Sequence, residues 1–495
     1  MDALKQLNDM QAKVGPRTTN GLSHDVLQRF LATDPRLAKA IDEAAREQAS
    51  LIQEFPEFAK LDEDTLIIKV QANYVNFYAE DQRNPYVAIA ARGPWLVTFH
   101  GAVLHDSGGY GMIGFGHAPE AVIAAMDKPV VMANIMTPSF SQHRLAERLH
   151  KAIGFSRAEG CPYQRFLCMN SGSESMTVAT RISDINAKRQ TDAGGRHAGQ
   201  RIMYLSLKGG FHGRTERPAM LSDSSAKNYR QNLASFRDLN VTYTVEPNNL
   251  AELQAAFDWA DREGVFFEST YLEPVMGEGD PGKAITPEFY ALARKLTLEH
   301  GSLLVVDAIQ AGMRATGCLS IVDYPGFEKL PAPDMETYSK AVNAGQYPLS
   351  ILAMNATAAN LYIRGVYGNT MTTNPRALDV AVAVLDEMTP DLRRNVQERG
   401  REFVTKFKGL QDRYPKIVRK VQGTGLIVSI DIDPSVFAVV GKGQLEEYLR
   451  RNGIGVIHGG INSLRFTPHF GITTPEIDLV VNAIAHAFEH GPKKI

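Results

Sequence analysis

The chain has 495 residues, more than one hydrophobic core ordinarily holds, so two or more domains are expected. Hydrophobic residues make up 44% and charged residues 22%, and 53 basic against 55 acidic side chains give a net charge of −2. This balance is typical of a globular protein and argues against nucleic acid or a membrane as a partner. Three cysteines without metal-ligand spacing, and an N-terminus without an apolar stretch, predict a cytoplasmic protein without a metal site.

The first 95 residues are polar and helix-prone. We expect residues 1–95 to form an N-terminal extension and part of a small domain. A short strand is predicted at 93–99, with 101–105 as its hairpin partner.

Residues 96–375 are expected to form the large domain, because short apolar runs alternate there with amphipathic segments such as 287–300. This alternation predicts an α/β fold with a mostly parallel sheet that carries helices on both faces and binds ligands at the carboxyl ends of its strands. The polar stretch 186–201 is expected to be an exposed insertion. The predicted strands are 201–205, 269–273, 303–307 and 349–353.

Residues 376–495 are expected to form a small α+β domain together with the N-terminal part of the chain. Helical patterns cover 376–387 and 401–414, and a last helix is predicted at 475–490. Residues 421–426 are expected to form a turn that leads into a strand at 427–432.

A first motif, Asn-Ser-Gly-Ser-Glu-Ser at 170–175, stands between a predicted strand and a predicted helix. Small residues at such a turn let backbone N–H groups converge on an anion, and the helix dipole favours negative charge there. The alternative is a plain helix cap that uses Ser173.

A second motif, Gly-Gly-Phe-His-Gly-Arg at 209–214, combines glycines with an aromatic ring. A tight loop of this kind can present the flat face of Phe211 to a cofactor's π-system. The alternative is an ordinary glycine-rich turn with a buried phenylalanine.

A third candidate is Asp307, which ends a strongly apolar strand and therefore needs a partner. It could be a metal ligand, a member of a salt bridge, or the counter-ion of a protonated ring nitrogen, which would make that ring an electron sink.

A fourth candidate is Lys340, which has small neighbours and is soon followed by glycine and proline. A lysine desolvated in such a loop has a lowered pKa, and its neutral amine can form a Schiff base. The alternative is a solvated surface lysine.

The order of these motifs resembles the class-III aminotransferases, a fold-type I family that depends on pyridoxal 5′-phosphate (PLP) and includes ornithine, 4-aminobutyrate and lysine ε-aminotransferases. The resemblance runs from about residue 93 to the C-terminus. Departures include Met276, Ala308 and the pair Thr372 and Thr373, where the family has glutamine, glutamate and two glycines. The matching segments are 170–174, 211–214, 273–279, 307–310, 339–340, 370–375 and 464–468.

The resemblance implies a catalytic role for Lys340, which would form the Schiff base, and for Asp307, which would pair with the pyridine nitrogen. Thr370 would reach the phosphate of a neighbouring subunit, so a homodimer with shared active sites is expected, and a tetramer is left open. The residues that the resemblance assigns to the cofactor are Gly172, Ser173, Phe211, His212, Asp307, Gln310, Lys340 and Thr370.

The resemblance also implies substrate-binding residues. Arg465 would bind a substrate carboxylate, and Glu278 would mask it when that carboxylate is absent. Tyr110 could line the substrate entrance, with an ordinary core aromatic as the alternative. The expected reaction moves an ω-amino group of a lysine- or ornithine-like donor to a 2-oxo acid such as 2-oxoglutarate.

Two other functions stay open on the sequence alone. A PLP-dependent racemase, epimerase or aminomutase would use the same fold without a 2-oxo acid. A non-catalytic binding protein of this fold is the alternative outside catalysis, although intact Lys340, Asp307 and Arg465 argue against it.

Overall fold

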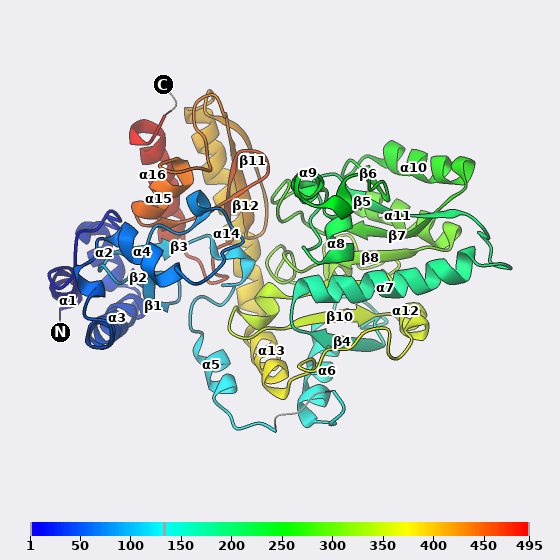
Figure 1. Cartoon of the computed structure of the whole chain (residues 1–495), viewed down its shortest axis with the longest axis horizontal. Helices are drawn as coiled ribbons and strands as arrows, with labels where there is room; N and C mark the ends of the chain where they lie inside the picture. Colours follow the sequence, from blue (N-terminus) through cyan, green and yellow to red (C-terminus); the bar gives the residue numbers. More distant parts are fainter. Residues whose placement is uncertain (1, 132–134, 494–495) are drawn as a thin grey trace. The chain divides into compact units, whose positions relative to one another are not determined.

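The structure is a computed structural model, and it describes residues 2–131 and 135–493 (Figure 1). The chain divides into two compact units. One contains both ends of the chain, Met1–Pro119 with Glu398–Ile495, and the other contains Glu120–Gln397. A small domain built from both termini was expected and is confirmed. The domain boundaries predicted at 95/96 and 375/376 stay a prediction.

A seven-stranded sheet forms the centre of the Glu120–Gln397 unit, in the order β4-β10-β9-β8-β7-β5-β6 (Figure 1). All its pairings are parallel except those of β10, which runs antiparallel to β9 and β4. The mostly parallel sheet is therefore confirmed. The strands are β4 (Arg165–Met169), β5 (Arg201–Leu207), β6 (Thr242–Val245), β7 (Val265–Leu272), β8 (Leu303–Asp307), β9 (Met335–Tyr338) and β10 (Ser350–Met354).

Helices cover this sheet, and every residue of β7 and β8 is buried. Helix α7 packs across β7, β9 and β10, whereas α10 and α11 pack on β7 and on each other. The helices are α5 (Glu120–Met126), α6 (Phe140–Ala152), α7 (Gly172–Thr191), α8 (Glu216–Leu221), α9 (Asp223–Asn232), α10 (Leu250–Glu263), α11 (Pro287–His300), α12 (Ala356–Leu361), α13 (Pro375–Glu387) and α14 (Pro390–Arg413), of which α14 continues into the other unit.

Helix α11 shows why some elements could be predicted to the residue. The Thr286 side chain caps its first turn, Pro287 occupies the first helical position, and Gly301 ends it with a φ of 76°. Each of these signals is local in sequence, since proline fits a helix start and glycine fits a left-handed end. The predicted helix at 287–300 is confirmed.

The exposed insertion predicted at 186–201 is wrong in part. Helix α7 continues to Thr191, and both Asn186 and His197 are buried. Asn186 donates to the Gly301 carbonyl at 2.9 Å, and His197 Nε2 lies 2.8 Å from the His300 carbonyl oxygen. The polar composition of this segment predicted exposure, but these side chains are buried because they hydrogen-bond to distant backbone groups.

The unit formed by both termini contains two four-stranded sheets, ordered β1-β2-β3-β13 and β11-β12-β15-β14. The hairpin predicted after residue 93 is confirmed, because β2 pairs antiparallel with β3. The strands are β1 (Ala88–Arg92), β2 (Trp95–Thr98), β3 (Val103–Asp106), β11 (Val418–Thr424), β12 (Ile427–Ile432), β13 (Ile454–Gly455), β14 (Ile457–Gly459) and β15 (Ser463–Phe466). The helices are α1 (Ala3–Gln11), α2 (His24–Leu31), α3 (Pro35–Glu54), α4 (Glu63–Gln71), α15 (Leu445–Arg451) and α16 (Thr474–His490).

One turn prediction in this unit is wrong in extent. Residues 421–424 belong to strand β11, and only 425–426 separate it from β12. Cross-strand hydrogen bonding overrides the low strand propensity of Gly423. None of the described helices combines the length and the apolar composition that a bilayer crossing requires.

Candidate active site

Several predicted site residues of the Glu120–Gln397 unit lie on loops at the carboxyl ends of neighbouring strands, three of which are β5, β7 and β8. Strand β7 lies between β5 and β8 in the sheet. After β5 the chain reaches Phe211, after β7 it reaches Glu273, and β8 ends at Asp307. The loops that follow parallel strands meet at one edge of a sheet, which is where α/β proteins bind their ligands.

Asp307 is 5% exposed, and three donors hold its carboxylate. His212 Nδ1 lies 2.9 Å from Oδ2, while the Ile309 N–H at 3.1 Å and the Thr337 hydroxyl at 3.3 Å donate to Oδ1. Burial opposes the charged imidazole, yet the hydrogen bond and the charge of Asp307 raise the pKa of His212 above its usual value. The sequence did not predict this pair, which joins residues 95 positions apart.

Lys340 opens a short 3-10 helix, Lys340–Asn343, and its Nζ contacts Gln310 Oε1. Its backbone has a φ of 47°, in the left-handed region that side chains rarely adopt. The preceding Ser339 hydroxyl donates to the Leu349 carbonyl at 2.7 Å, which ties this turn to the start of β10. Strained non-glycine backbone held by its surroundings is typical of functional sites.

The anion turn lies at the start of α7, where Ser171 is the cap and Gly172 and Ser173 are the first helical residues. Ser173 Oγ accepts the Arg214 N–H at 3.3 Å, so this turn is bonded to the aromatic turn. A Cβ on Gly172 would lie 2.7 Å from Ile309 Cδ1, so only glycine fits there without displacement. The first N–H groups of a helix have no carbonyl partner within it and can bind an anion.

The aromatic turn begins with Gly209, whose φ is 75°. Phe211 is half-buried, and the Arg214 guanidinium carbon lies 5.4 Å from its ring centroid. The Phe211 N–H donates to Glu273 Oε1 at 2.9 Å. A partly open ring held by its own backbone can stack on a planar ligand.

Glu273 is a site residue that the sequence showed only as part of a motif. It follows β7 directly and is 4% exposed. Burial raises its pKa to about 7, against the opposing effect of His212 and of the N–H groups of Phe211 and Gly277. The signal for Glu273 in the sequence is the same as for Asp307, an acid at the end of a strand that is expected to be buried.

The residues of this unit fit PLP. The anion turn suits a phosphate, the Phe211 face suits a ring, and the buried Asp307 carboxylate suits a protonated ring nitrogen. Gln310 Nε2 and His212 Nε2 are buried, and no other described residue hydrogen-bonds to either atom. Buried polar atoms of this kind call for a partner that the protein chain itself does not provide.

Four predicted residues lie at the edge of this arrangement or outside the unit. Thr370 is exposed before α13, and Glu278 is half-buried after β7. Arg465 is buried on β15, and Tyr110 has a φ of 49° with its ring centroid 5.7 Å from that of Tyr78. Arg465 and Tyr110 belong to the unit formed by both termini, so their meeting with Lys340 stays a prediction.

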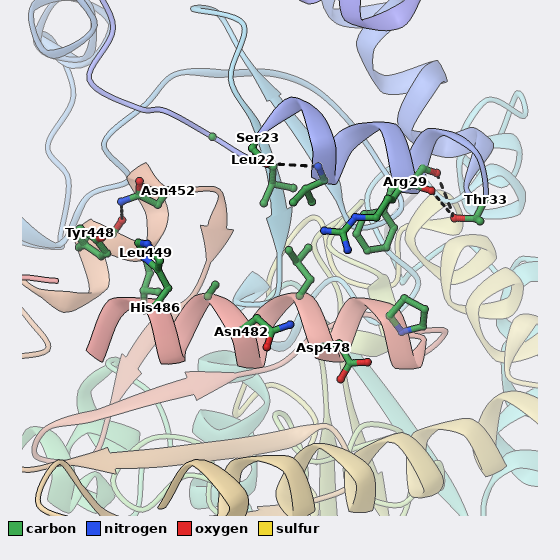
Figure 2. A pocket seen from close by; sticks show the side chains of 16 residues that line it. Leu22, Ser23, Arg29, Thr33, Tyr448, Leu449, Asn452, Asp478, Asn482 and His486 are labelled. Atoms are coloured by element: carbon green, nitrogen blue, oxygen red, sulfur yellow. Dashed lines mark hydrogen bonds between the residues drawn. The ribbon is translucent and has the colours of Figure 1, made fainter. Parts of the chain in front are cut away.

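A separate cavity of about 670 Å³ lies among α2, α15 and α16 (Figure 2). Its walls carry Leu22 and Arg29 from the N-terminal segment and Asn482 from α16. None of the sixteen residues that line it is a predicted site residue. The cavity is therefore not part of the proposed active site.

Two buried histidines share one carboxylate oxygen in the same unit as this cavity. His105 Nε2 and His469 Nε2 lie 3.2 Å and 2.8 Å from Glu476 Oε1, and these side chains are of the types that bind metal ions. The Thr473 N–H and hydroxyl donate to Oε2 at 2.7 Å and 2.6 Å. The carboxylate is thus satisfied by the chain itself, and the prediction of no metal site stays a prediction.

Solved structures share this fold. The ornithine aminotransferase from Toxoplasma gondii matches with a TM-score of 0.74 and 22% identity, covering 88% of this chain and 98% of that chain. The acetylornithine aminotransferase from Elizabethkingia anophelis matches with a TM-score of 0.68 and 20% identity, covering 86% and 98%. The architecture is therefore that of fold-type I PLP-dependent transferases, as expected.

The sequence comparisons identify the family. The class-III aminotransferase family matches residues 77–488, so the chain belongs to the class-III aminotransferases and is a PLP-dependent enzyme that transfers amino groups. Ornithine aminotransferase 2 from Staphylococcus aureus strain Mu50 is 27% identical over 414 residues, which are 82% of this chain and 94% of that protein. The LysW-aminoadipate semialdehyde transaminase from Deinococcus radiodurans is 29% identical over 376 residues, which are 76% and 79%. The isomerase and non-catalytic alternatives gain no support from these matches.

Proposed function

We propose that this aminotransferase takes the ω-amino group of a lysine- or ornithine-like amino acid or diamine and passes it to a 2-oxo acid such as 2-oxoglutarate. The observation that carries the site assignment is the contact of Lys340 Nζ with Gln310. Gln310 lies three residues after Asp307, which is buried and paired with His212. The relatives named for ornithine and for aminoadipate semialdehyde support a donor that reacts through a terminal (ω) amino group.

The residues that hold PLP lie on neighbouring loops in this proposal. Gly172 and Ser173 bind the phosphate at the start of α7, Phe211 supports the ring, and Gln310 offers its unpaired amide nitrogen to the ring's oxygen. His212 acts through Asp307. When bound, PLP supplies an aldehyde that accepts amino groups and a ring that withdraws electrons.

Asp307 keeps a positive charge on the ring nitrogen in this proposal. Its carboxylate is fixed by three donors, so it needs no reorganisation when charge develops nearby. His212, whose pKa is raised, places a further proton next to the carboxylate and keeps it oriented.

Lys340 has two tasks in this proposal. Its ε-amine would hold the cofactor, and the neutral amine would take a proton from the substrate carbon that bears the amino group and return it later in the reaction. Gln310 Oε1 contacts Nζ and can hold the amine in position between these tasks. The strained backbone at Lys340 fixes where the side chain starts.

Substrate recognition is assigned to residues of both units. Arg465 binds a carboxylate through its planar guanidinium, Glu278 competes for Arg465 when that carboxylate is absent, and Tyr110 lines the entrance. Thr370, exposed before α13, contributes to the phosphate site of a second subunit. We therefore propose a homodimer that works in the cytoplasm, with a mass in solution of twice 54.5 kDa or a multiple of that.

The Lys340 assignment is tested by reducing the PLP-loaded enzyme with borohydride and locating the cofactor by peptide mass mapping. The label is expected on Lys340 alone. Lys340→Ala should lose the visible absorbance of bound cofactor and at least about 10³-fold in turnover, because general acid–base catalysis by one side chain supplies up to about 10⁴-fold. Lys227→Ala, an exposed lysine on α9, is the matched control. Full activity of Lys340→Ala would refute the assignment.

The donor assignment is tested by following the cofactor absorbance after adding single amines. Ornithine, lysine and linear diamines are expected to bleach the loaded enzyme faster than α-amino acids without a terminal amine. A 2-oxo acid should then restore the starting spectrum. Bleaching by α-amino groups alone would contradict the proposed ω-amino donor.

A further inference from the structure

One buried carboxylate joins two loops of the proposed active site. Glu273 follows β7, and its two oxygens accept two different backbone N–H groups. Oε1 accepts the Phe211 N–H at 2.9 Å, and Oε2 accepts the Gly277 N–H at 2.9 Å. The side chain thus connects the aromatic turn after β5 with the segment that carries Glu278.

The two loops also touch through their backbones. A Cβ on Gly279 would lie 2.1 Å from the Gly209 carbonyl oxygen, so this approach leaves no room for a side chain. A displacement of one loop is therefore passed to the other, because there is no free space between them to absorb it.

The charge of Glu273 belongs to the same buried group as Asp307. The charge of His212 favours the ionised form of Glu273 and the charge of Asp307 opposes it, while the imidazole itself hydrogen-bonds to Asp307. Burial raises the pKa of Glu273 to about 7. A carboxylate that ionises near neutrality while accepting two N–H groups holds them more strongly than a neutral acid does.

We propose that Glu273 is a positioning residue of the transamination site that sets the Phe211 turn against the Glu278 segment and so couples cofactor stacking to recognition of the substrate carboxylate. The inference rests on the proposed roles of Phe211 and Glu278. It assigns Glu273 no contact with cofactor or substrate.

Glu273→Gln tests this coupling with little change in volume. A glutamine has one acceptor oxygen, and its amide nitrogen only donates, so it cannot serve two N–H groups that bind the two different oxygens of the carboxylate. One loop is released. The dissociation constant of PLP from the apoenzyme is expected to rise about tenfold, and the KM for the amino donor several-fold, with a smaller change in kcat.

Double-mutant cycles separate coupling from a general loss of stability. Phe211→Leu and Glu273→Gln are combined and PLP affinity is measured; Glu278→Gln and Glu273→Gln are combined and the donor KM is measured. If Glu273 acts through these residues, each double variant is at most about threefold worse than its worse single variant. Independent action predicts the product of the single effects, which is about 100-fold for PLP affinity when Phe211→Leu, like Glu273→Gln, weakens it about tenfold, and that result would overturn the proposal.

Glu268→Gln is the matched control, because Glu268 is a buried acid on β7, the strand that Glu273 follows, and its partners are Tyr271 and Arg217 rather than the N–H groups of the two loops. It should leave PLP affinity and the donor KM within twofold of the parent enzyme, and equal damage from both variants would also overturn the proposal. Glu273→Asp, which keeps the charge with a shorter reach, replaces the glutamine in both cycles if folding suffers. If the double variants show the product of the single effects and the enzyme still transaminates, only this inference is rejected. An active Lys340→Ala enzyme, in contrast, rejects the proposed function.

Discussion

Glu268→Gln is expected to make the Glu120–Gln397 unit several kcal/mol more stable at alkaline pH and to change its stability by less than about 1 kcal/mol at pH 5. Glu268 is buried on β7, where the Tyr271 hydroxyl lies 3.2 Å from Oε1 and an Arg217 nitrogen lies 3.6 Å away. Oε2 is buried, and no described residue hydrogen-bonds to it. Burial raises the pKa of Glu268 from 4.5 to about 8, with Arg217 offsetting part of the effect.

The sign and the size of the effect follow from proton linkage. A folded-state pKa above the unfolded value means that stability is fully present below about pH 4.5 and is lost as the pH rises to about 8. At about 1.4 kcal/mol per pH unit the full loss is about 5 kcal/mol, and relaxation around Arg217 reduces it to about 3–5 kcal/mol. A glutamine does not ionise, so the variant escapes this loss.

Thermal unfolding of the apoenzyme at pH 5 and at pH 8.5 measures the difference. For a unit of this size 1 kcal/mol moves the unfolding temperature by about 2 °C, so Glu268→Gln should unfold about 6–10 °C above the parent at pH 8.5. Glu263→Gln, an exposed acid that ends α10, should show no such difference. Parallel pH profiles for parent and variant would refute the reasoning, because Glu268 would then ionise equally in both states.

Two further substitutions test the site. Asp307→Asn offers one acceptor oxygen to three donors, so it should destabilise the unit by about 1–3 kcal/mol and cut turnover at least 100-fold. Thermal unfolding and steady-state kinetics measure the two effects, and Asp238→Asn, at an exposed position, is the control. Parent-like turnover would contradict the role of Asp307. Gly279→Ala forces a Cβ onto the Gly209 carbonyl and should weaken PLP binding to the apoenzyme at least tenfold, whereas Gly409→Ala on α14, which meets no atom within 4 Å, should not. Unchanged PLP affinity in Gly279→Ala would show that the two loops move independently.

Local signals made much of the fold predictable. Strand β8 runs over Leu303–Asp307 as predicted, because an apolar run bounded by turn residues is buried on both faces. Because Asp307 ends this strand, its carboxylate was expected to be buried and to need a partner, and it is buried. The contact of Lys340 with Gln310 agrees with the order of motifs along the chain.

Long-range pairings were not predictable from one sequence. The partner of Asp307 is His212, which the resemblance assigned to the cofactor but which nothing in the sequence paired with Asp307. The burial of His197 depends on a backbone carbonyl of residue 300. In each case the side chain is polar, and it can be buried only because folding brings it to a hydrogen-bonding partner that is distant in the sequence.

The buried acids of this unit show why the partners of a group say more than its pKa. Burial raises the pKa of Glu336 to about 7, the same value as for Glu273. Glu336 accepts the hydroxyls of Tyr163 and Tyr338 at 2.7 Å and 2.8 Å, the hydroxyl of Ser320, and the Ile321 N–H at 2.9 Å.

Three of the four donors to Glu336 are side chains that the acid fixes within the core. Both donors to Glu273 are backbone N–H groups of loops that carry predicted site residues. Loss of the Glu336 carboxylate should therefore reduce stability, whereas loss of the Glu273 carboxylate moves Phe211 and Glu278. Two buried acids with the same pKa can thus have different functions, because the effect of each depends on which groups donate hydrogen bonds to its carboxylate oxygens.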